Sequence, residues 1–275
     1  MALPRLQLFE FNDSPWAPKV LRDTVVEALS RSLRWGRMLD GLVEPFEAFL
    51  AACGTHEVLD LCAGAGGPAQ VLAEAMSRRG RQARFLLTDL FPQVPAWEAL
   101  RAELPGRLDF VPLPVDATAI PADLGAGRAR VIINALHHFP PALARRVLRG
   151  ACEDAPGVFV AEGLVRNPLR FAAFLPVGLP ALLAAPVLAK DRRLARALLS
   201  WATPVALAVS AWDGAVSTLR IYEPAELRSM VADLPGWTWR HGTYAYAGVG
   251  RGTWFYGVRV DGRPASPGSA SFPSS

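Results

Sequence analysis

The middle of the chain alternates short apolar runs with segments of helical periodicity such as 68–79, 94–104 and 141–155. Runs of this kind are typical of strands buried on both faces, and their alternation with helices indicates a parallel sheet. Because right-handed crossovers bring the carboxyl ends of parallel strands to one edge, we expect the acids and glycines that end these runs to meet there. The runs are EVLDLC (57–62), RFLLTD (84–89), LDFVPLPVD (108–116), ARVIINAL (129–136) and GVFVAEGL (157–164).

Both flanks of this region add elements of their own. Apolar residues at helical spacing predict a helix over 18–38, and a shorter helix over 44–53 that ends at Gly54. Near the other end, 237–248 and 253–260 are rich in aromatic and β-branched residues and predict an antiparallel hairpin. A helix over 224–234 precedes the hairpin.

Composition excludes several classes of protein. Hydrophobic residues make up 51% and charged residues 20% of the chain, which is incompatible with extensive disorder. The net charge of +4 comes without a Lys/Arg block, so no nucleic-acid partner is expected. Cys53, Cys62 and Cys152 lack metal-ligand spacing, and no metal or disulfide framework is predicted. The start of the sequence has no secretory pattern, so the expected location is cytoplasmic.

The turn after the first run carries the strongest chemical signal. Asp60 precedes Gly64, Gly66 and Gly67 in the pattern D-x-x-x-G-x-G-G. Glycines let a backbone turn tightly and approach a ligand, and the following helix points its amino terminus at that ligand. The spacing differs from the G-x-G-x-x-G of dinucleotide sites, which disfavours a nicotinamide cofactor. The alternative is an ordinary turn between a strand and a helix that binds no ligand.

Two further acids end the next apolar runs. Asp89 ends the second run, where a carboxylate can accept hydrogen bonds from ribose hydroxyls. Asp116 ends the third run and is placed to accept from an adenine amino group. The acids and the loop together favour a nucleoside-containing ligand.

On these residues, 55–165 resembles the class I S-adenosylmethionine-dependent methyltransferases. The resemblance implies a Rossmann-like α/β fold with a central, mostly parallel seven-stranded sheet, and S-adenosyl-L-methionine as cofactor with S-adenosyl-L-homocysteine as product. It places Asp60 and Gly64–Gly66 at the methionine part, Asp89 at the ribose and Asp116 at the adenine. The family usually has glycine where this chain has Cys62. The expected cofactor contacts are Asp60, Cys62, Ala63, Gly64, Gly66, Asp89, Leu90, Asp116, Ala117 and Asn134.

The fourth run leads into Asn134-Ala-Leu-His137-His138-Phe. Histidine has a suitable pKa for a general base, which a hydroxyl acceptor needs and a carboxylate acceptor does not. His137 and His138 are therefore the catalytic candidates, with Glu162 a weaker one. The alternative is a purely structural pair that packs and hydrogen-bonds the loop.

The segment 212–222, with the pattern W-D-G-x-V-S-x-L-R-x-Y, resembles a signature of a less-studied branch of the same family. Arg220 could bind a substrate carboxylate through two parallel hydrogen bonds. The alternative is a salt bridge between Arg220 and Asp213. The expected substrate-binding residues are Trp16, Trp212, Arg220 and Tyr222.

The stretch 171–189 has no charged residue but contains three prolines, and a basic KDRR (190–193) follows it before a second apolar stretch, 197–211. Three interpretations stay open: a lid over a hydrophobic acceptor pocket, a surface-inserted hairpin that makes the protein peripheral at a membrane through 171–211, and a pair of membrane spans.

The expected organisation is a helical cap (1–54), a cofactor-binding core (55–164), an apolar helical insertion or lid (165–222), the end of the core (223–260) and a disordered tail (261–275). The expected activity is O-methylation of a hydroxyl or carboxylate on a hydrophobic small molecule of secondary metabolism. The alternatives are C- or N-methylation, or a non-catalytic protein that binds a membrane or partner. The oligomeric state stays open.

Overall fold

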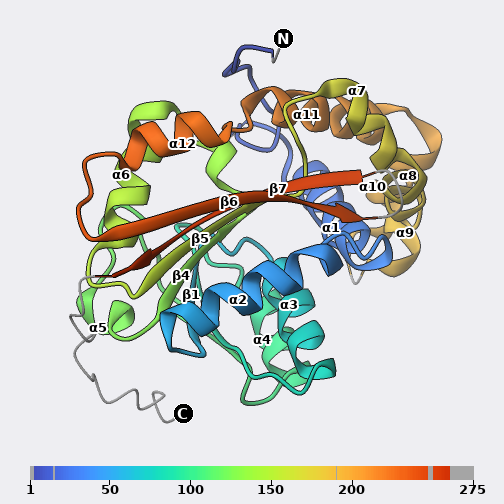
Figure 1. Ribbon diagram of the computed structural model, residues 1–275. Helices are drawn as coiled ribbons and strands as arrows, with labels where there is room; N and C mark the ends of the chain where they lie inside the picture. Colours follow the sequence, from blue (N-terminus) through green and yellow to red (C-terminus); the bar gives the residue numbers. More distant parts are fainter. Residues whose placement is uncertain (1–2, 15, 190, 247–249, 261–275) are drawn as a thin grey trace.

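The computed structural model describes residues 3–14, 16–189, 191–246 and 250–260 (Figure 1). Its centre is a seven-stranded sheet of order β3-β2-β1-β4-β5-β7-β6. Neighbours among β1 to β5 are parallel, whereas β7 is antiparallel to both β5 and β6. The predicted mostly parallel sheet with a carboxyl-terminal antiparallel hairpin is confirmed. The strands are β1 (Glu57–Leu61), β2 (Arg84–Thr88), β3 (Leu108–Phe110), β4 (Ala129–Ile133), β5 (Gly157–Glu162), β6 (Trp237–Tyr246) and β7 (Gly250–Arg259).

Helices cover both faces of the sheet, which is why its central strands are apolar throughout (Figure 1). On one face, Phe46 and Phe49 of α2 pack with Phe85 and Phe159 of the sheet. On the other face, α6 and α12 supply a second buried cluster that includes Leu148. The helices flanking the sheet are α2 (Val43–Cys53), α3 (Gly67–Arg78), α4 (Val94–Glu103), α5 (Ala122–Gly125), α6 (Pro141–Cys152) and α12 (Pro224–Val231).

The third apolar run forms less strand than the sequence predicts. Strand β3 ends at Phe110, and the rest of the 108–116 run is a loop containing Pro112 and Pro114. Proline has no N–H to donate to a sheet ladder and fixes its own φ, so two prolines in three residues disfavour a longer strand even at the edge position that β3 occupies. Asp116 therefore lies in a loop beyond β3 and does not end a strand, which corrects the expectation.

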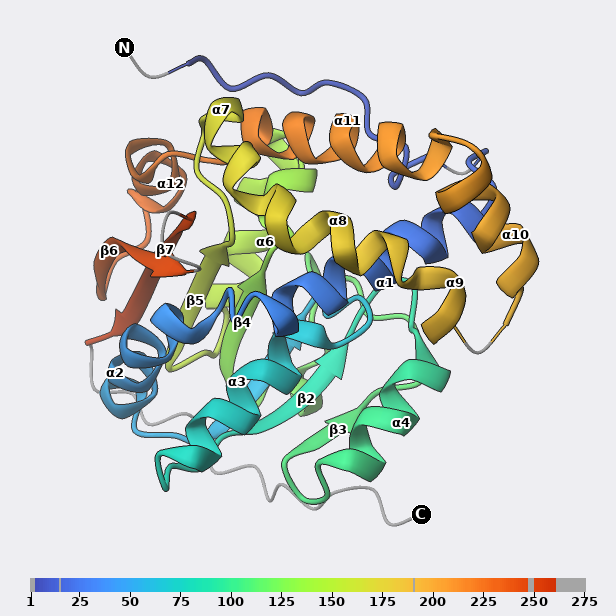
Figure 2. The same ribbon diagram turned by 90° about the vertical axis from the view of Figure 1, so that its right-hand side faces the viewer.

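The first helix of the chain packs mainly against the helices of the apolar insertion and not on a face of the sheet. Helix α1 (Lys19–Trp35) contacts α3 and α8 (Leu175–Leu183), and Figure 2 shows α8 crossing it with α11 (Val205–Arg220) above. Leu21 and Val25 of α1 share a buried cluster with Leu182 and Val209 of these two helices. Helix α2, in contrast, belongs to the main core beneath.

The apolar insertion is a chain of short helices. Pro186 lies in the first turn of α9, and an extended residue, Thr203, separates η4 from α11. No single described helix is long and apolar enough to cross a membrane; one pair, 193–202 and 205–220, meets that test only jointly, with a 75° bend between its members. The elements are α7 (Pro168–Phe171), η3 (Ala172–Phe174), α8 (Leu175–Leu183), α9 (Ala185–Leu188), α10 (Arg193–Ala197), η4 (Leu198–Ala202) and α11 (Val205–Arg220).

Part of the basic KDRR sequence makes ion pairs within the chain. Arg192 lies 4.0 Å from Asp23 of α1, and the nearby Arg196 pairs with Glu27 at 2.9 Å. Lys190 lies outside the described residues, as does the expected disordered tail 261–275.

Candidate active site

The turn after β1 uses left-handed backbone at three positions. Gly64 and Gly66 have φ of 54° and 81°, and Cys62 has φ of 63°. A residue with a β-carbon is strained by roughly 1–2 kcal/mol in this region, which explains why glycine is the usual residue there. The turn accommodates Cys62 all the same.

Hydrogen bonds hold this turn against the end of β2. The Gly64 N–H donates to Asp89 Oδ2 at 2.8 Å, and the Ala63 N–H donates to the Thr88 carbonyl at 3.0 Å. On the other side, the Trp97 indole donates to the Gly64 carbonyl at 2.8 Å. The loop is therefore fixed before any ligand arrives.

The three predicted acids converge on the Cys62 side chain. Burial raises the pKa of the Cys62 thiol, and the charges of Asp89, Asp60 and Asp116 raise it further, in that order. The Val115 N–H donates to the Asp89 carbonyl at 2.9 Å, which brings the loop that carries Asp116 to the end of β2. Segments that are far apart in the sequence thus meet around one loop.

Asp60 is buried, with 2% of its surface exposed, and its Oδ2 atom has no hydrogen-bond partner among the described residues. Burial, and secondly the charge of Asp89, raises its pKa well above the ordinary value of 3.8. An unpaired buried carboxylate destabilises a protein unless a ligand compensates it. Asp60 is therefore a group that a cationic ligand would stabilise.

Replacing Asp60 with asparagine should stabilise the ligand-free protein. Because the pKa of Asp60 is raised in the folded protein, the free energy of unfolding of the wild type falls as pH rises from 3.8, the pKa of this group in the unfolded chain, towards its pKa in the folded protein. Asparagine does not ionise, so the variant lacks this loss. Its melting temperature should therefore exceed that of the wild type by an amount that grows between pH 5 and 8 and reaches roughly 2–4 °C. Thermal unfolding of both proteins across this pH range measures the effect. Equal melting temperatures at pH 8 would contradict the buried-charge argument.

The remaining cofactor candidates lie around the same edge. Leu90 is exposed directly after Asp89, and Ala117 is buried in the loop beyond β3. The exposed Asp116 accepts from both the N–H and the hydroxyl of Thr118 at 2.8 Å, and the backbone bond is the larger cause of its lowered pKa. Its orientation is thus fixed by the loop.

Asn134 and His137 link the ends of β4 and β5. Asn134 has φ of 56°, and its Oδ1 accepts from the Gly163 N–H at 2.6 Å. The Nδ1 of His137 lies 2.8 Å from Glu162 Oε2, while its backbone N–H donates to Glu162 Oε1 at 3.1 Å. When Nδ1 carries the proton shared with Glu162, Nε2 is left as a free acceptor.

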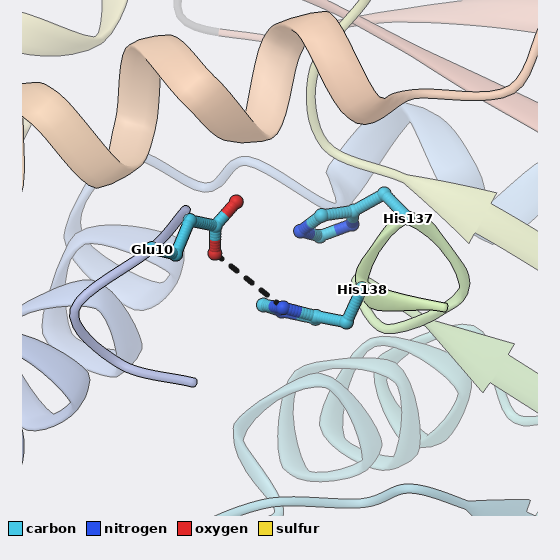
Figure 3. A group of neighbouring side chains, drawn as sticks. All are labelled: Glu10, His137 and His138. Carbon is cyan, nitrogen blue, oxygen red and sulfur yellow. Dashed lines mark ion pairs between the residues drawn. The ribbon is translucent and has the colours of Figure 1, made fainter. Parts of the chain in front are cut away.

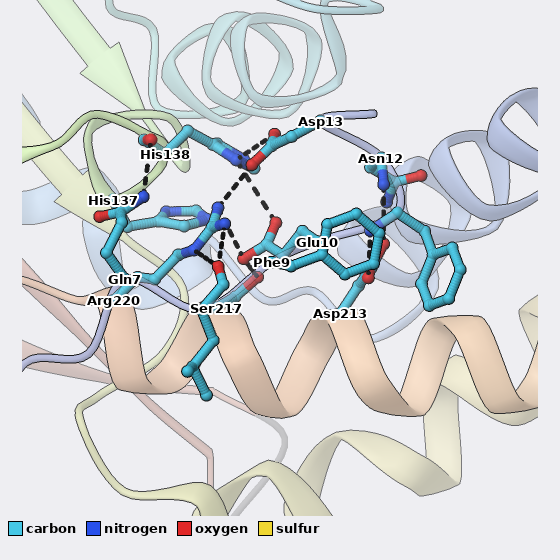
Figure 4. A network of polar contacts seen from close by, with 12 residues as sticks. Gln7, Phe9, Glu10, Asn12, Asp13, His137, His138, Asp213, Ser217 and Arg220 are labelled. Carbon is cyan, nitrogen blue, oxygen red and sulfur yellow. Dashed lines mark hydrogen bonds and ion pairs between the residues drawn. The ribbon is translucent and has the colours of Figure 1, made fainter. Parts of the chain in front are cut away.

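Residues 3–14, here called the amino-terminal strap, lie along α11 and reach the histidines (Figure 4). Arg220 donates to the Leu8 carbonyl and lies 3.2 Å from Glu10 Oε1 and 2.6 Å from Asp13 Oδ2. On the same side, His138 Nδ1 lies 3.0 Å from Asp13 Oδ1.

Asp213 also binds the strap. Its carboxylate accepts from the N–H groups of Phe11 and Asn12 at 2.8 and 3.0 Å. The expected alternative of a salt bridge between Arg220 and Asp213 is wrong, because each side chain binds a different part of the strap. The polarity of 212–222 is thus explained by a segment far away in the sequence.

The strap carboxylates have opposite pKa shifts. Burial raises the pKa of Glu10 to about 7, although the charges of His138 and Arg220 oppose it. Burial also acts to raise the pKa of Asp13, but its contacts with His138 and Arg220 and the charges of these two residues outweigh burial and lower the value to about 2. Asp13 is therefore the permanent anion of the network.

The predicted substrate-binding residues lie at two different places along the strap. Trp212 donates its indole N–H to the Phe9 carbonyl at 2.9 Å, and the Phe9 ring stacks on Trp16 with centroids 5.6 Å apart. These residues and Arg220 lie around the strap. Tyr222 is buried and donates to the Phe139 carbonyl at 2.6 Å, next to the histidine turn η2 (Leu136–His138). The guanidinium of Arg5, at the start of the strap, lies 4.1 Å from the centre of its ring.

Glu10 and Asp13 are not among the site residues that the sequence predicts. Residues 1–16 show no periodicity, and a carboxylate in an irregular segment gives no sign of the partners it will meet. The only signal was indirect: Asp213 and Arg220 are polar residues that follow an apolar stretch and require partners when buried.

No protein-family model matches the sequence, and a search of curated proteins finds no match. Among solved structures, the chain is similar to N,N-8-amino-8-demethyl-D-riboflavin dimethyltransferase from Streptomyces davawensis, with 16% identity, a TM-score of 0.52, and coverage of 90% of this chain and 61% of that one.

The similarity to two further structures is weaker. An O-methyltransferase family protein from Burkholderia thailandensis has 17% identity and a TM-score of 0.45, with coverage of 84% of this chain and 60% of that one. An O-methyltransferase from neocarzinostatin biosynthesis has 18% identity and a TM-score of 0.46, with coverage of 89% of this chain and 62% of that one. The chain thus spans about three fifths of the length of each of these proteins. The likeness to the dimethyltransferase shows that the chain has the class I methyltransferase fold, as the sequence predicts.

Proposed function

We propose that the protein is an S-adenosylmethionine-dependent methyltransferase that methylates an oxygen, in a hydroxyl or carboxylate, of a hydrophobic small molecule. The observation that carries this proposal is the convergence of Asp60, Asp89 and Asp116 on the turn at Cys62–Gly66. The fold shared with the dimethyltransferase supports it.

The residues present fit the cofactor. Asp60 offers an uncompensated buried carboxylate to the cationic methionine part. Asp89 keeps acceptor capacity for ribose hydroxyls, since each carboxylate oxygen has two lone pairs and each accepts one backbone N–H. Asp116, fixed by Thr118, is the residue for the adenine amino group. When bound, the cofactor supplies a methyl group on a sulfonium ion.

The chain's own task is to align the acceptor and take up its proton. His137 is the better candidate for the base, because Glu162 orients its ring and leaves Nε2 free. Its backbone bond to the same carboxylate fixes the turn as well. A carboxylate acceptor would need no base, and the pair would then serve to position it.

The acceptor is proposed to be hydrophobic because the insertion exposes many large apolar side chains. These residues lie on α8 to α11, next to α1 and the strap. They are Leu175, Leu179, Leu183, Val187, Leu188, Leu194, Leu198, Trp201, Val205, Leu207 and Trp212. The same surface supports the alternative of contact with a membrane surface through 171–211, although the ion pairs of Arg192 and Arg196 engage charges that could otherwise meet anionic lipid.

N-methylation is kept as an alternative because the solved dimethyltransferase is named for an amino-riboflavin. A non-catalytic protein of this fold is the alternative from another class. The intact Asp60 and loop glycines argue for cofactor binding.

Saturating S-adenosylhomocysteine should raise the melting temperature of the purified protein. At a hundredfold excess over the dissociation constant, the stabilisation is about 2.7 kcal/mol, or roughly 5–10 °C for a chain of this size. Adenosine triphosphate at equal concentration serves as the control nucleotide. A folded protein that S-adenosylhomocysteine leaves unchanged would overturn the proposed function.

A further inference from the structure

Three potential metal ligands lie together above the sheet edge. Ligand atoms of Glu10, His137 and His138 all lie within 4.8 Å of one another (Figure 3). Glu10 comes from the strap and the two histidines from turn η2, so the group forms only in the folded chain. Two imidazoles and a carboxylate are the donor set of many zinc and non-haem iron sites.

The spacing suits a small cation. Glu10 Oε2 lies 3.4 Å from His138 Nδ1. Ligands with bonds of about 2.1 Å at tetrahedral angles are about 3.4 Å apart. The Nε2 of His137 is the third donor, because its Nδ1 faces Glu162.

The surroundings are those of a metal site as well. The contact of His137 Nδ1 with Glu162 at 2.8 Å is the carboxylate–histidine pairing that orients most metal-bound imidazoles. The buried Nδ1 of His138 has no hydrogen bond of good geometry within the described part of the chain, although two carboxylates lie beside it. Asp13 lies 3.0 Å from that nitrogen and pairs with Arg220 at 2.6 Å, so it lies beside the three ligands and holds Arg220 there.

Three carboxylates line the group. Glu10 and Asp13 lie beside His138, and Glu162 lies beside His137. Arg220 pairs with Glu10 and Asp13, so a bound cation would share these two carboxylates with its guanidinium. His138 and Asp13 are partly exposed, which leaves a path from solvent.

We propose that Glu10, His137 and His138 bind one divalent transition-metal ion of the zinc or manganese type. The strap then closes the site by delivering Glu10 to the metal. A hydroxyl bound to such an ion releases its proton to water near neutral pH, so the metal would replace His137 as the means of activating the acceptor. This last role rests on the proposed function, whereas metal binding does not.

The test uses the full chain, freed of metal by a chelator and then titrated with zinc chloride and, separately, manganese chloride. Calorimetry should show one equivalent of zinc bound, with a melting temperature raised by about 5 °C or more. His138→Asn and Glu10→Gln, which keep size and polarity, should each weaken zinc binding at least tenfold. His56→Asn is the matched control, because His56 is exposed and precedes β1, at the opposite end of the strand from the turn.

S-adenosylhomocysteine binding is measured on every variant, to show that it is folded and to separate this proposal from the proposed function. Wild-type protein that binds S-adenosylhomocysteine but neither metal would overturn the metal site alone. Zinc binding that persists in His138→Asn and Glu10→Gln but is lost in Cys62→Ser would assign the ion to a thiolate and would equally overturn it.

Discussion

Alanine at position 89 should weaken S-adenosylhomocysteine binding by at least about 100-fold. The Asp89 carboxylate is expected to accept two ribose hydroxyls, and a hydrogen bond to a charged group contributes about 1.5–3 kcal/mol. The same carboxylate holds the Gly64 and Phe91 N–H groups, so its loss also loosens the loop. Calorimetric titration of the purified variant measures the change.

Two comparisons separate these causes. Glu98→Ala, at an exposed position on α4, should bind the ligand as the wild type does. With wild-type protein, a 2′-deoxy analogue of S-adenosylhomocysteine should bind more weakly than the parent, and in Asp89→Ala this difference should vanish. A variant that binds the parent ligand with wild-type affinity would remove Asp89 from the ribose site.

Gly66→Ala should destabilise the fold by roughly 3 kcal/mol and lower the melting temperature by about 6–12 °C. Gly66 has φ of 81°, where a β-carbon is strained. A β-carbon there would also lie 2.6 Å from Leu100 Cδ1 and 3.0 Å from Leu87 Cδ1. Thermal or chemical unfolding of the ligand-free protein measures the loss.

Gly54→Ala is the matched control for this effect. Gly54 has φ of 66° at the end of α2, but nothing lies within 4 Å of a β-carbon built there. This variant should therefore lose only the conformational part, about 1 kcal/mol. Equal losses in the two variants would show that the loop does not pack as tightly against Leu87 and Leu100 as the structure indicates.

The sheet and its loop could be predicted because their signals are local. The run 57–62 is apolar on both faces because β1 lies between β2 and β4, and Gly54 ends α2 because its backbone is left-handed. Asp60 and Asp89 could be placed for the same reason: parallel strands bring their carboxyl ends to one edge.

The other half of the site could not be predicted because its contacts are not local. Glu10 and Asp13 lie in a segment without periodicity, and their partners His138 and Arg220 come from two distant elements. The expected length of β3 was wrong for a different reason, since apolar composition predicted a strand where Pro112 and Pro114 disfavour one. Whether Arg220 binds a substrate carboxylate stays a prediction, although its ion pairs with the strap mean that a substrate would have to displace them.

The strap also has a consequence for the order in which the protein assembles. Asp13 and its partner Arg220 are 207 residues apart in sequence. A ribosome therefore exposes the strap long before it has made α11, the helix against which the strap binds. The ion pairs of Arg220 with Glu10 and Asp13 can therefore form only after α11 has been made, when the segment that carries the loop glycines has already been synthesised. The strap half of the site is thus completed later in synthesis than the loop half.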